Sequence, residues 1–346
     1  MPLYEMRKFV APELIFGAGS RHRAGYYALN LQARRLLIVS DPGVIQAGWL
    51  DDLMPTLEEA GLETRVFSGV TPNPRDHEIM AGVALYRHEG CDVILAIGGG
   101  SVIDCAKGIG VVVGNGGQVL DYAGVDRISL PGPPLICIPT TAGTAADISQ
   151  FAIVNDVGRR CKTAIVSKTV VPDIALVDPE VTLTMDPYLT ACAGLDALTH
   201  AIEAYVSTAS SPVVDIHALA AIELVRDNIK TAVAEPADLA ARENRCWPAC
   251  RRAWPSRTPA SAPCMPWRIA WAAIWILPMA RATRSCSIMS SASTSASPKP
   301  ATSRWRAPWA CRRTGRRRRS GKSASWARFR SCAGPVVSRP VWRRAA

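Results

Sequence analysis

The chain has 346 residues, enough for two domains and a large buried core, and its 40 Lys and Arg against 29 Asp and Glu give a net charge of +11. That average combines two different compositions. Residues 245–346 contain no Asp, Glu or His, but 20 Arg, 2 Lys and nine of the ten Trp, which leaves 18 basic and 29 acidic residues, a net −11, in residues 1–244. The bulk charge therefore does not indicate a nucleic-acid or membrane partner for the first part.

The first part carries no sign of a leader or a membrane anchor. No basic and apolar leader with a cleavage site is visible, and no apolar run is long enough to span a bilayer, so we expect a cytoplasmic protein with no membrane partner. Its five cysteines lack C-x-x-C spacing and lie mostly in apolar runs, which predicts reduced, buried thiols: Cys91, Cys105, Cys137, Cys161 and Cys192.

Short apolar runs alternate with helix-like stretches through the first 190 residues. We predict, in chain order, a strand over 34–41, a helix over 48–61, a strand over 63–70, a helix over 77–90 and a strand over 91–100. Such alternation is typical of parallel strands with crossover helices. From Pro187 the periodicity is purely helical, over 189–207 and 214–233. The predicted fold class is an α/β, Rossmann-like dinucleotide-binding domain over 1–187, followed by the start of an all-α domain over 188–244.

Two loops at strand ends predict a cofactor site. Gly98, Gly99 and Gly100 allow a tight turn after an apolar strand, and Ser101 opens a helix whose free amides and dipole favour a pyrophosphate. The pattern is not G-x-G-x-x-G, and a plain structural turn is the alternative. A second loop over 138–149 offers the hydroxyls of Thr140, Thr141 and Thr144, which fits the same crevice.

Asp41 ends the first strand of the alternation. A carboxylate there can accept hydrogen bonds from an adenosine ribose and would repel a 2′-phosphate, which favours NAD over NADP. An Asp that begins a turn before Pro42 is the structural alternative.

Asp196 and His200 are spaced i and i+4, so they project from one helix face and could hold a divalent metal together. A surface Asp and His pair without a metal is the alternative interpretation. Glu203 falls one position short of the next turn from His200 and is interpreted as solvated or as a neighbour of the ligands.

Six ordered segments resemble the iron-containing (group III) alcohol dehydrogenases: VAPELIFGAGS, TPNP, AIGGGSVIDCAKGI, IPTTAGT, VPDIALVDPE and GLDALTHAIEAYVS. The resemblance covers residues 8–244 and implies an NAD(P)-binding domain, a helical domain, and a catalytic Fe²⁺, or alternatively Zn²⁺, between them. It implies a small alcohol or aldehyde substrate, no nucleic-acid partner, and homo-oligomers for intact members.

The resemblance also implies roles for individual residues. Asp196 and His200 would be two metal ligands. The cofactor site would consist of Asp41 at the adenosine ribose with Asn73 nearby, of Gly98, Gly99, Gly100 and Ser101 at the pyrophosphate, and of Thr140, Thr141, Ser149, Phe151 and Lys162. The family continues TTAGT with G-S-E, whereas this chain has Ala145, Ala146 and Asp147, a variation closest to the branch of alcohol-dehydrogenase-like regulatory proteins.

The family needs two further histidine ligands, and this chain has no histidine after His217. Degenerate codons for residues 261–279, read one base earlier, permit L-G-A-V-H-A-M-A-H-S-L-G-G-Y-L-D-L-P-H, which resembles the missing family segment. Residues 246–250 similarly permit the apolar sequence M-L-A-C-L. We therefore interpret residues 245–346 as translated in the wrong frame and expect them to be disordered or misfolded.

The basic, Trp-rich tail has one other interpretation, a nucleic-acid-binding arm, because basic groups neutralise phosphates and aromatic rings stack on bases. The exclusion of every acidic residue over a hundred positions, without any helical or strand period, favours the frameshift. Two function classes follow. One is an iron-dependent, NAD-linked alcohol dehydrogenase that transfers hydride between a primary alcohol or aldehyde and nicotinamide. The other is a catalytically inactive or regulatory family member, or the non-functional product of a frameshifted gene.

Overall fold

The structure is a computed structural model that describes residues 10–207 and 211–253, with side chains through Cys246. The expected disorder or misfolding of the tail therefore lies, from residue 254 onward, outside the described residues.

The predicted parallel sheet is present and has six strands, all parallel. Their order across the sheet is β1-β9-β6-β4-β2-β3, so β2, β4 and β6 are neighbours near its centre. The strands are β1 (Glu13–Phe16), β2 (Arg35–Val39), β3 (Glu63–Phe67), β4 (Val93–Gly98), β6 (Leu135–Pro139) and β9 (Ile174–Val177). The α/β fold class predicted for this part of the chain is confirmed.

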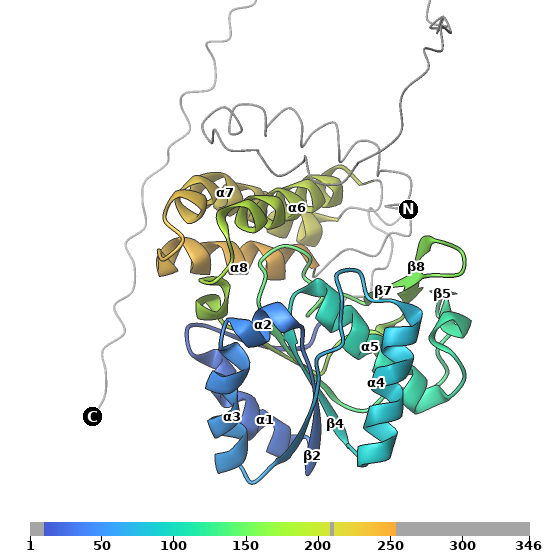
Figure 1. The fold of residues 1–346 in the computed structure, drawn as a ribbon. Helices are drawn as coiled ribbons and strands as arrows, with labels where there is room; N and C mark the ends of the chain where they lie inside the picture. Colours follow the sequence, from blue (N-terminus) through green and yellow to red (C-terminus); the bar gives the residue numbers. More distant parts are fainter. Residues whose placement is uncertain (1–9, 208–210, 254–346) are drawn as a thin grey trace, which may run out of the picture. The chain divides into compact units, whose positions relative to one another are not determined.

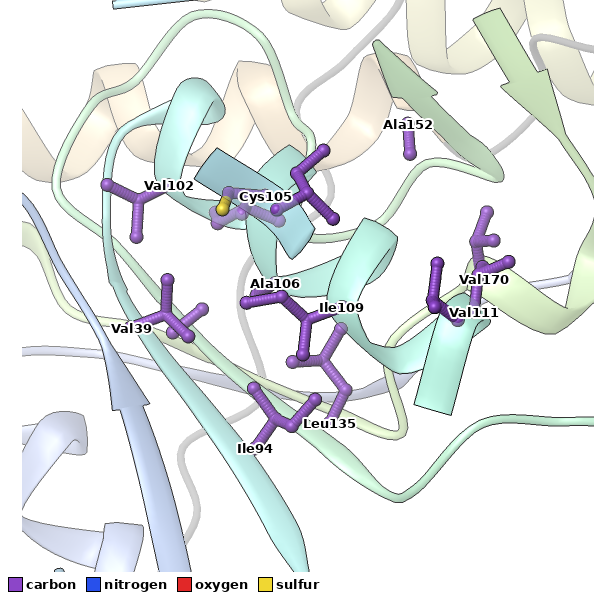
Figure 2. Packing of buried hydrophobic residues seen from close by; sticks show 14 of the residues in the cluster. Val39, Ile94, Val102, Cys105, Ala106, Ile109, Val111, Leu135, Ala152 and Val170 are labelled. Carbon is purple, nitrogen blue, oxygen red and sulfur yellow. The ribbon is translucent and has the colours of Figure 1, made fainter. Parts of the chain in front are cut away.

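Helices cover both faces of this sheet (Figure 1). The three on one face are α1 (Ala24–Asn30), α2 (Pro42–Gln46) and α3 (Trp49–Glu59), and the two on the other are α4 (Asp76–Glu89) and α5 (Gly100–Asn115). Side chains alternate along each strand. Leu36 and Ile38 of β2 therefore pack in the core beneath α1 and α3, while Leu37 and Val39 pack in the core beneath α4 and α5. Figure 2 shows Val39 and Ile94 of the sheet facing Ile109 of α5. A fully buried side chain of this size contributes about 1.5–3 kcal/mol, which makes both helical layers integral to the fold.

A second, three-stranded sheet was not predicted from the sequence. It consists of β5 (Gly124–Val125), β8 (Cys161–Val166) and β7 (Phe151–Asp156), and β7 pairs antiparallel with β8. Residues of β7 are alternately half-buried and buried. The hydrophobic period of two residues is weak over six residues, which is why the sequence did not predict this strand. Short 3-10 turns complete this part: η1 (Ser20–Arg23), η2 (Val119–Tyr122), η3 (Lys168–Val170) and η4 (Pro179–Thr182).

The two helices predicted after Pro187 are present as α6 (Pro187–Val206) and α7 (Pro212–Ala234), and α8 (Leu239–Ala253) follows. Both begin with a proline after a capping side chain: Asp186 accepts from the amide of Leu189 and Ser211 from that of Val214. The domain boundary predicted after Asn244 does not coincide with the end of a helix, because α8 continues to Ala253. Among the described residues no helix combines the length and apolar character needed to cross a membrane.

The five predicted thiols are free cysteines, but they are not all buried. Cys91, Cys105 and Cys137 lie in the core, where burial raises the pKa of each thiol. Cys161 is exposed and Cys192 is half-buried. The prediction of buried thiols was wrong for Cys161, because β8 begins with exposed residues and only its second half is covered.

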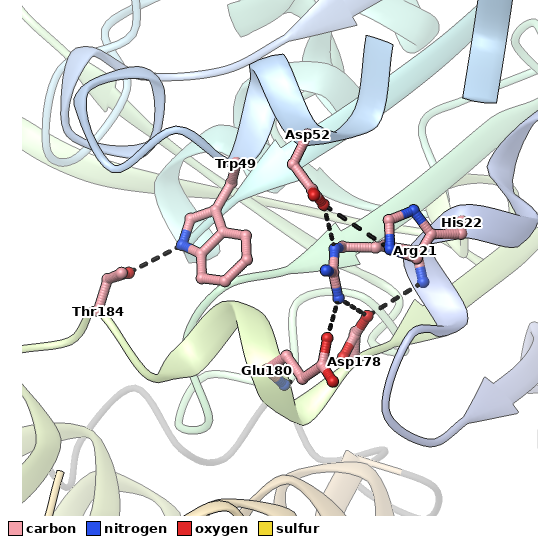
Figure 3. A network of polar contacts seen from close by, with 7 residues as sticks. All are labelled: Arg21, His22, Trp49, Asp52, Asp178, Glu180 and Thr184. Atoms are coloured by element: carbon pink, nitrogen blue, oxygen red, sulfur yellow. Dashed lines mark hydrogen bonds and ion pairs between the residues drawn. The ribbon is translucent and has the colours of Figure 1, made fainter. Parts of the chain in front are cut away.

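Arg21 connects three segments that are far apart in sequence (Figure 3). Its guanidinium is almost fully buried, with Nε donating to Asp52 of α3 at 2.6 Å and Nη1 to Asp178 at 2.7 Å and Glu180 at 2.5 Å. Asp178 is completely buried and also caps η4 by accepting from the amide of Glu180. Arg21 thereby holds the segment between β9 and α6 against the sheet.

Replacing Arg21 by Met should lower the free energy of unfolding by about 3–5 kcal/mol, because the buried Asp178 carboxylate then lacks its cation. The matched control is Arg23→Met in the same turn. Arg23 is exposed and contacts only the Tyr26 ring at 5.0 Å among its described partners, so its loss should cost less than about 1 kcal/mol. Urea unfolding curves measure both, and equal losses for the two variants would contradict the role of Arg21.

Candidate cofactor and metal site

Asp41, the glycine turn and Thr140, three parts of the predicted cofactor site, lie at one edge of the six-stranded sheet. Asp41 follows β2, Gly99 follows β4 and Thr140 follows β6, and these three strands are adjacent and parallel. Gly98 of β4 lies beside Pro139 of β6 in the register. Carboxyl ends of neighbouring parallel strands form a crevice, so these loops converge as the sequence predicted.

The turn from β4 into α5 leaves no space for side chains. A Cβ on Gly98 would lie 2.5 Å from Cγ2 of Val102, and one on Gly100 would lie 2.6 Å from Oγ1 of Thr144. Gly99 is the N-cap residue of α5 and supplies no side-chain cap, so a ligand can reach the first amides of this 16-residue helix. A 16-residue helix with no side-chain cap, beginning directly after a tight glycine turn, fits a dinucleotide pyrophosphate at its positive end.

Asn73 and Ser101 join a third loop to this cradle. The backbone amide of Asn73 donates to Oγ of Ser101 at 3.0 Å, and Asn73 has a left-handed φ of 61°. Asn tolerates this conformation better than most residues, which gives a local reason for Asn at this position. The Asn73 prediction is therefore consistent with the placement of residues 71–74 beside the start of α5.

The loop after β6 packs directly on the glycine turn. The Thr140 amide donates to the carbonyl of Gly98 at 3.0 Å, and a Cβ on Gly99 would lie 3.3 Å from Cγ2 of Thr141. Farther along the loop, a Cβ on Gly143 would lie 3.0 Å from atoms of Ala193 in α6. This loop therefore lies between the glycine turn and the helix that carries Asp196 and His200.

Ala145 is where the chain departs from the glycine of the family pattern, and it has a left-handed φ of 49°. Glycine adopts this conformation without steric cost, whereas alanine is strained there. Ala145, Ala146 and Asp147 are all buried, so the altered residues lie inside the loop rather than on its surface. The three altered residues therefore affect the packing beneath the loop rather than its exposed surface.

Asp41 serves as a helix cap in this structure. Its Oδ1 accepts from the amides of Gly43 at 2.8 Å and Val44 at 3.0 Å, at the start of α2. The structural alternative considered for Asp41 is thus realised. It does not compete with ribose binding, because both described bonds use Oδ1 and Oδ2 can still accept from a ligand.

Lys107 contacts two of the predicted cofactor residues and was not itself predicted from the sequence. It lies on α5 with 2% of its surface exposed, and its Nζ donates to the carbonyls of Ser149 at 2.7 Å and Phe151 at 2.9 Å. These are two of the predicted cofactor residues, so one buried ammonium ties them to the helix that begins at the glycine turn. Burial lowers the pKa of Lys107, against the opposing charge of Asp104.

Asp104 lies one turn before Lys107 and was also missed. Burial raises its pKa to about 7, while the positive charges of Lys107 and, less strongly, Lys162 oppose the shift. Lys162 is exposed on β8, the strand paired with the β7 strand that Phe151 begins. The sequence shows only the i, i+3 spacing of Asp104 and Lys107, whereas their burial and the contacts of Lys107 come from the tertiary structure.

Asp196 and His200 lie together on one face of α6, as predicted. Oδ1 of Asp196 is 3.4 Å from Nε2 of His200, and Oε2 of Glu203 is 3.5 Å from Nδ1 of the same imidazole. All three side chains are partly exposed. Within the described ranges no group of three or more His, Cys, Asp or Glu side chains is arranged to hold a metal. The described residues thus offer two donors, with Glu203 placed to orient the imidazole.

The family model for iron-containing alcohol dehydrogenases matches residues 11–179, and the model of the Fe-containing alcohol dehydrogenase family C-terminal region matches residues 190–250. Alcohol dehydrogenase 4 of Schizosaccharomyces pombe is 43% identical over 233 residues, which are 67% of this chain and 55% of that protein. The NAD-dependent methanol dehydrogenase of Bacillus methanolicus is 37% identical over 235 residues, 68% of this chain and 62% of that protein.

A crystal structure of 1,3-propanediol oxidoreductase superposes with a TM-score of 0.71 at 36% identity, covering 72% of this chain and 66% of that one. The chain therefore spans only about 55–62% of the length of the two curated relatives described here.

The glycine cradle predicts a sharp contrast between two substitutions in α5. Gly100→Ala places a methyl group against Thr144 and should weaken NAD binding at least ~10-fold, since the loop after β6 must move away from the glycine turn. Gly110→Ala, on the same helix, meets its nearest neighbour at an ordinary 3.8 Å and should leave NAD binding unchanged. Fluorescence titration with NAD measures both, and equal affinities for the two variants would exclude the cradle as the pyrophosphate site.

Proposed function

Because this chain belongs to the iron-containing alcohol dehydrogenase family, we propose that it binds NAD at the carboxyl ends of β2, β4 and β6. We propose further that it derives from an enzyme that transfers hydride between a small primary alcohol, or the aldehyde, and nicotinamide. The observation that carries the proposal is the cradle of Gly98 to Gly100, closed by the loop of Thr140 to Thr144.

Each part of this site has a distinct role in holding the dinucleotide. The amides of Gly100 and Ser101 bind the pyrophosphate, since they precede the first amide that donates to Gly99, that of Val102, and stand at the positive end of the helix dipole. Oδ2 of Asp41 accepts from the adenosine ribose while Oδ1 keeps α2 capped. Thr140, Thr141 and Lys162 line the remainder, and Lys107 fixes Ser149 and Phe151 by their carbonyls.

The described residues do not complete a catalytic iron site. Catalytic metal sites in proteins hold the ion with about three or more protein ligands and keep one position open for substrate, where the ion acts as a Lewis acid. Asp196 and His200 supply two donors from one helix face, which leaves an ion mostly hydrated. We therefore assign no catalytic step to a metal in this chain.

This shortage of ligands favours a second candidate function for the chain as it stands, an NAD-binding protein without alcohol turnover. A regulatory family member and the product of a frameshifted gene both belong to this class. Residues after Asn244 contain no histidine, aspartate or glutamate, so they offer none of these side chains as further metal ligands.

NAD should bind more tightly than NADP, because the Asp41 carboxylate would repel the 2′-phosphate. Asp41→Asn tests the charge alone, since Asn caps a helix as well as Asp does and α2 should remain intact. The variant should gain NADP affinity by ~10-fold relative to NAD, a preference measured by calorimetric titration of both cofactors. NADP binding equal to or tighter than NAD binding in the unchanged chain would remove Asp41 from this role.

Alcohol oxidation with NAD and Fe²⁺ should be negligible for this chain and should return when the reading frame is restored after Asn244. Asp196→Ala or His200→Ala in the restored protein should then abolish the activity, measured as NADH absorbance, while NAD binding persists. Resequencing the DNA at the codons of Asn244 and Arg245 identifies the base that was gained or lost. Turnover of a primary alcohol by the uncorrected chain would refute both the frameshift and the ligand assignment.

A further inference from the structure

Two buried arginines lie less than one turn apart on α8, and their surroundings differ completely. Arg242 is 1% exposed and fully engaged, with Nε donating to the carbonyl of Pro236 at 3.0 Å, Nη1 to Oγ1 of Thr190 at 2.8 Å and Nη2 to the carbonyl of Met185 at 3.2 Å. Such a buried cation is stabilised by its hydrogen bonds to polar groups. Arg242 is therefore built into the contact between α8 and the start of α6.

Two polar side chains near Arg242, those of Asp238 and Asn244, also make hydrogen bonds. Asp238 caps α8 by accepting from the amide of Ala241 at 3.0 Å. Nδ2 of Asn244 donates to Oδ1 of Asn228 on α7 at 3.2 Å. Through Asn244, the polar side chains described here for α8 meet partners that suit them.

Arg245 is 2% exposed and lies in a different environment. Neither Nε nor Nη2 has a hydrogen-bond partner in the part of the chain that the structure describes. A Cβ built on Gly194 of α6 would lie 2.8 Å from Nη2 and 2.7 Å from Cδ1 of Ile229 on α7, so the guanidinium lies between a glycine backbone and an apolar side chain. Burial, together with the charge of Arg242, lowers the pKa of Arg245 to about 10. At neutral pH the position thus holds a desolvated cation whose Nε and Nη2 find no partner among the described residues.

A backbone fault follows within the same turn. Pro248 has no amide hydrogen, so the carbonyl of Asn244 lacks the donor that an uninterrupted helix would supply four residues later. A proline inside a helix costs about 3 kcal/mol relative to alanine. The side-chain misfit at Arg245 and the missing donor at Pro248 arise from different atoms, yet both begin immediately after Asn244.

We infer that the contact among α6, α7 and α8 is built for an apolar side chain at position 245, and that the sequence stops matching its own fold between Asn244 and Arg245. The neighbouring reading frame permits the apolar segment M-L-A-C-L over residues 246–250, which directly follow this position on α8. The burial pattern thus locates the onset of the mismatch without reference to histidines, metal or activity. The inference goes beyond the proposed function and does not depend on cofactor binding.

The test compares Arg245→Met and Arg242→Met in the full chain, because the two residues are equally buried arginines on one helix. Arg245→Met removes a desolvated cation and should raise the thermal midpoint by ~3–6 °C. Arg242→Met deprives two carbonyls and a hydroxyl of their donor and should lower the midpoint by at least ~3 °C. Arg245→Lys keeps a buried charge and should give no increase.

An unchanged or lowered midpoint for Arg245→Met would overturn the inference, because it would mean that the guanidinium is accommodated where it lies. A midpoint raised equally by Arg245→Lys would overturn it as well, since the burial of charge would then not be the cause. NAD titration of the same variants separates the two proposals. A raised midpoint without any NAD binding would leave the inference intact and refute the proposed function alone.

Discussion

The close packing of two side chains against the glycine turn at the carboxyl end of β4 is the constraint on which the rest of the site depends. Gly98 and Gly100 have no room for a Cβ because Val102 and Thr144 occupy that space. This contact holds the loop after β6 against the start of α5, which exposes the helix amides and directs the following residues toward α6. An anion site made of backbone atoms needs no charged side chain, and none of the residues in this turn is charged.

Two buried cations, Lys107 and Arg21, connect segments that lie far apart in sequence. Lys107 joins α5 to the start of β7, so the helix that begins at the glycine turn also positions Ser149 and Phe151. Arg21 joins η1 and α3 to the segment that leads from β9 to α6. Both are stabilised by fixed acceptors, carbonyls in one case and carboxylates in the other. Such fully satisfied polar groups specify a single arrangement of the segments that they connect.

Arg245 is also a buried cation, but it lacks the fixed acceptors that stabilise Lys107 and Arg21. It is as buried as Lys107, but its Nε and Nη2 have no described partner, and the charge of Arg242 adds repulsion. Among the described residues the segments around the glycine turn pack closely, and Asp196 and His200 are the two candidate metal donors found together. The glycine turn and the loops around it come from residues 1–190, whereas the resemblance would take the two further histidine ligands from a later region, where this chain has no histidine.

The sequence by itself determined the parallel sheet, the long helices, the glycine turn and the pairing of Asp196 with His200, because periodicity and i, i+4 spacing are local properties of the chain. It did not reveal the β7 and β8 hairpin or the exposure of Cys161, since short strands are decided by what covers them. Only the tertiary structure decided that Asp41 caps α2 with one oxygen and that Lys107 reaches Ser149 and Phe151, 42 and 44 residues away. Likewise, codon reasoning placed the break near Arg245, but the burial of its guanidinium among Gly194 and Ile229 depends on how three helices pack, which no local pattern encodes.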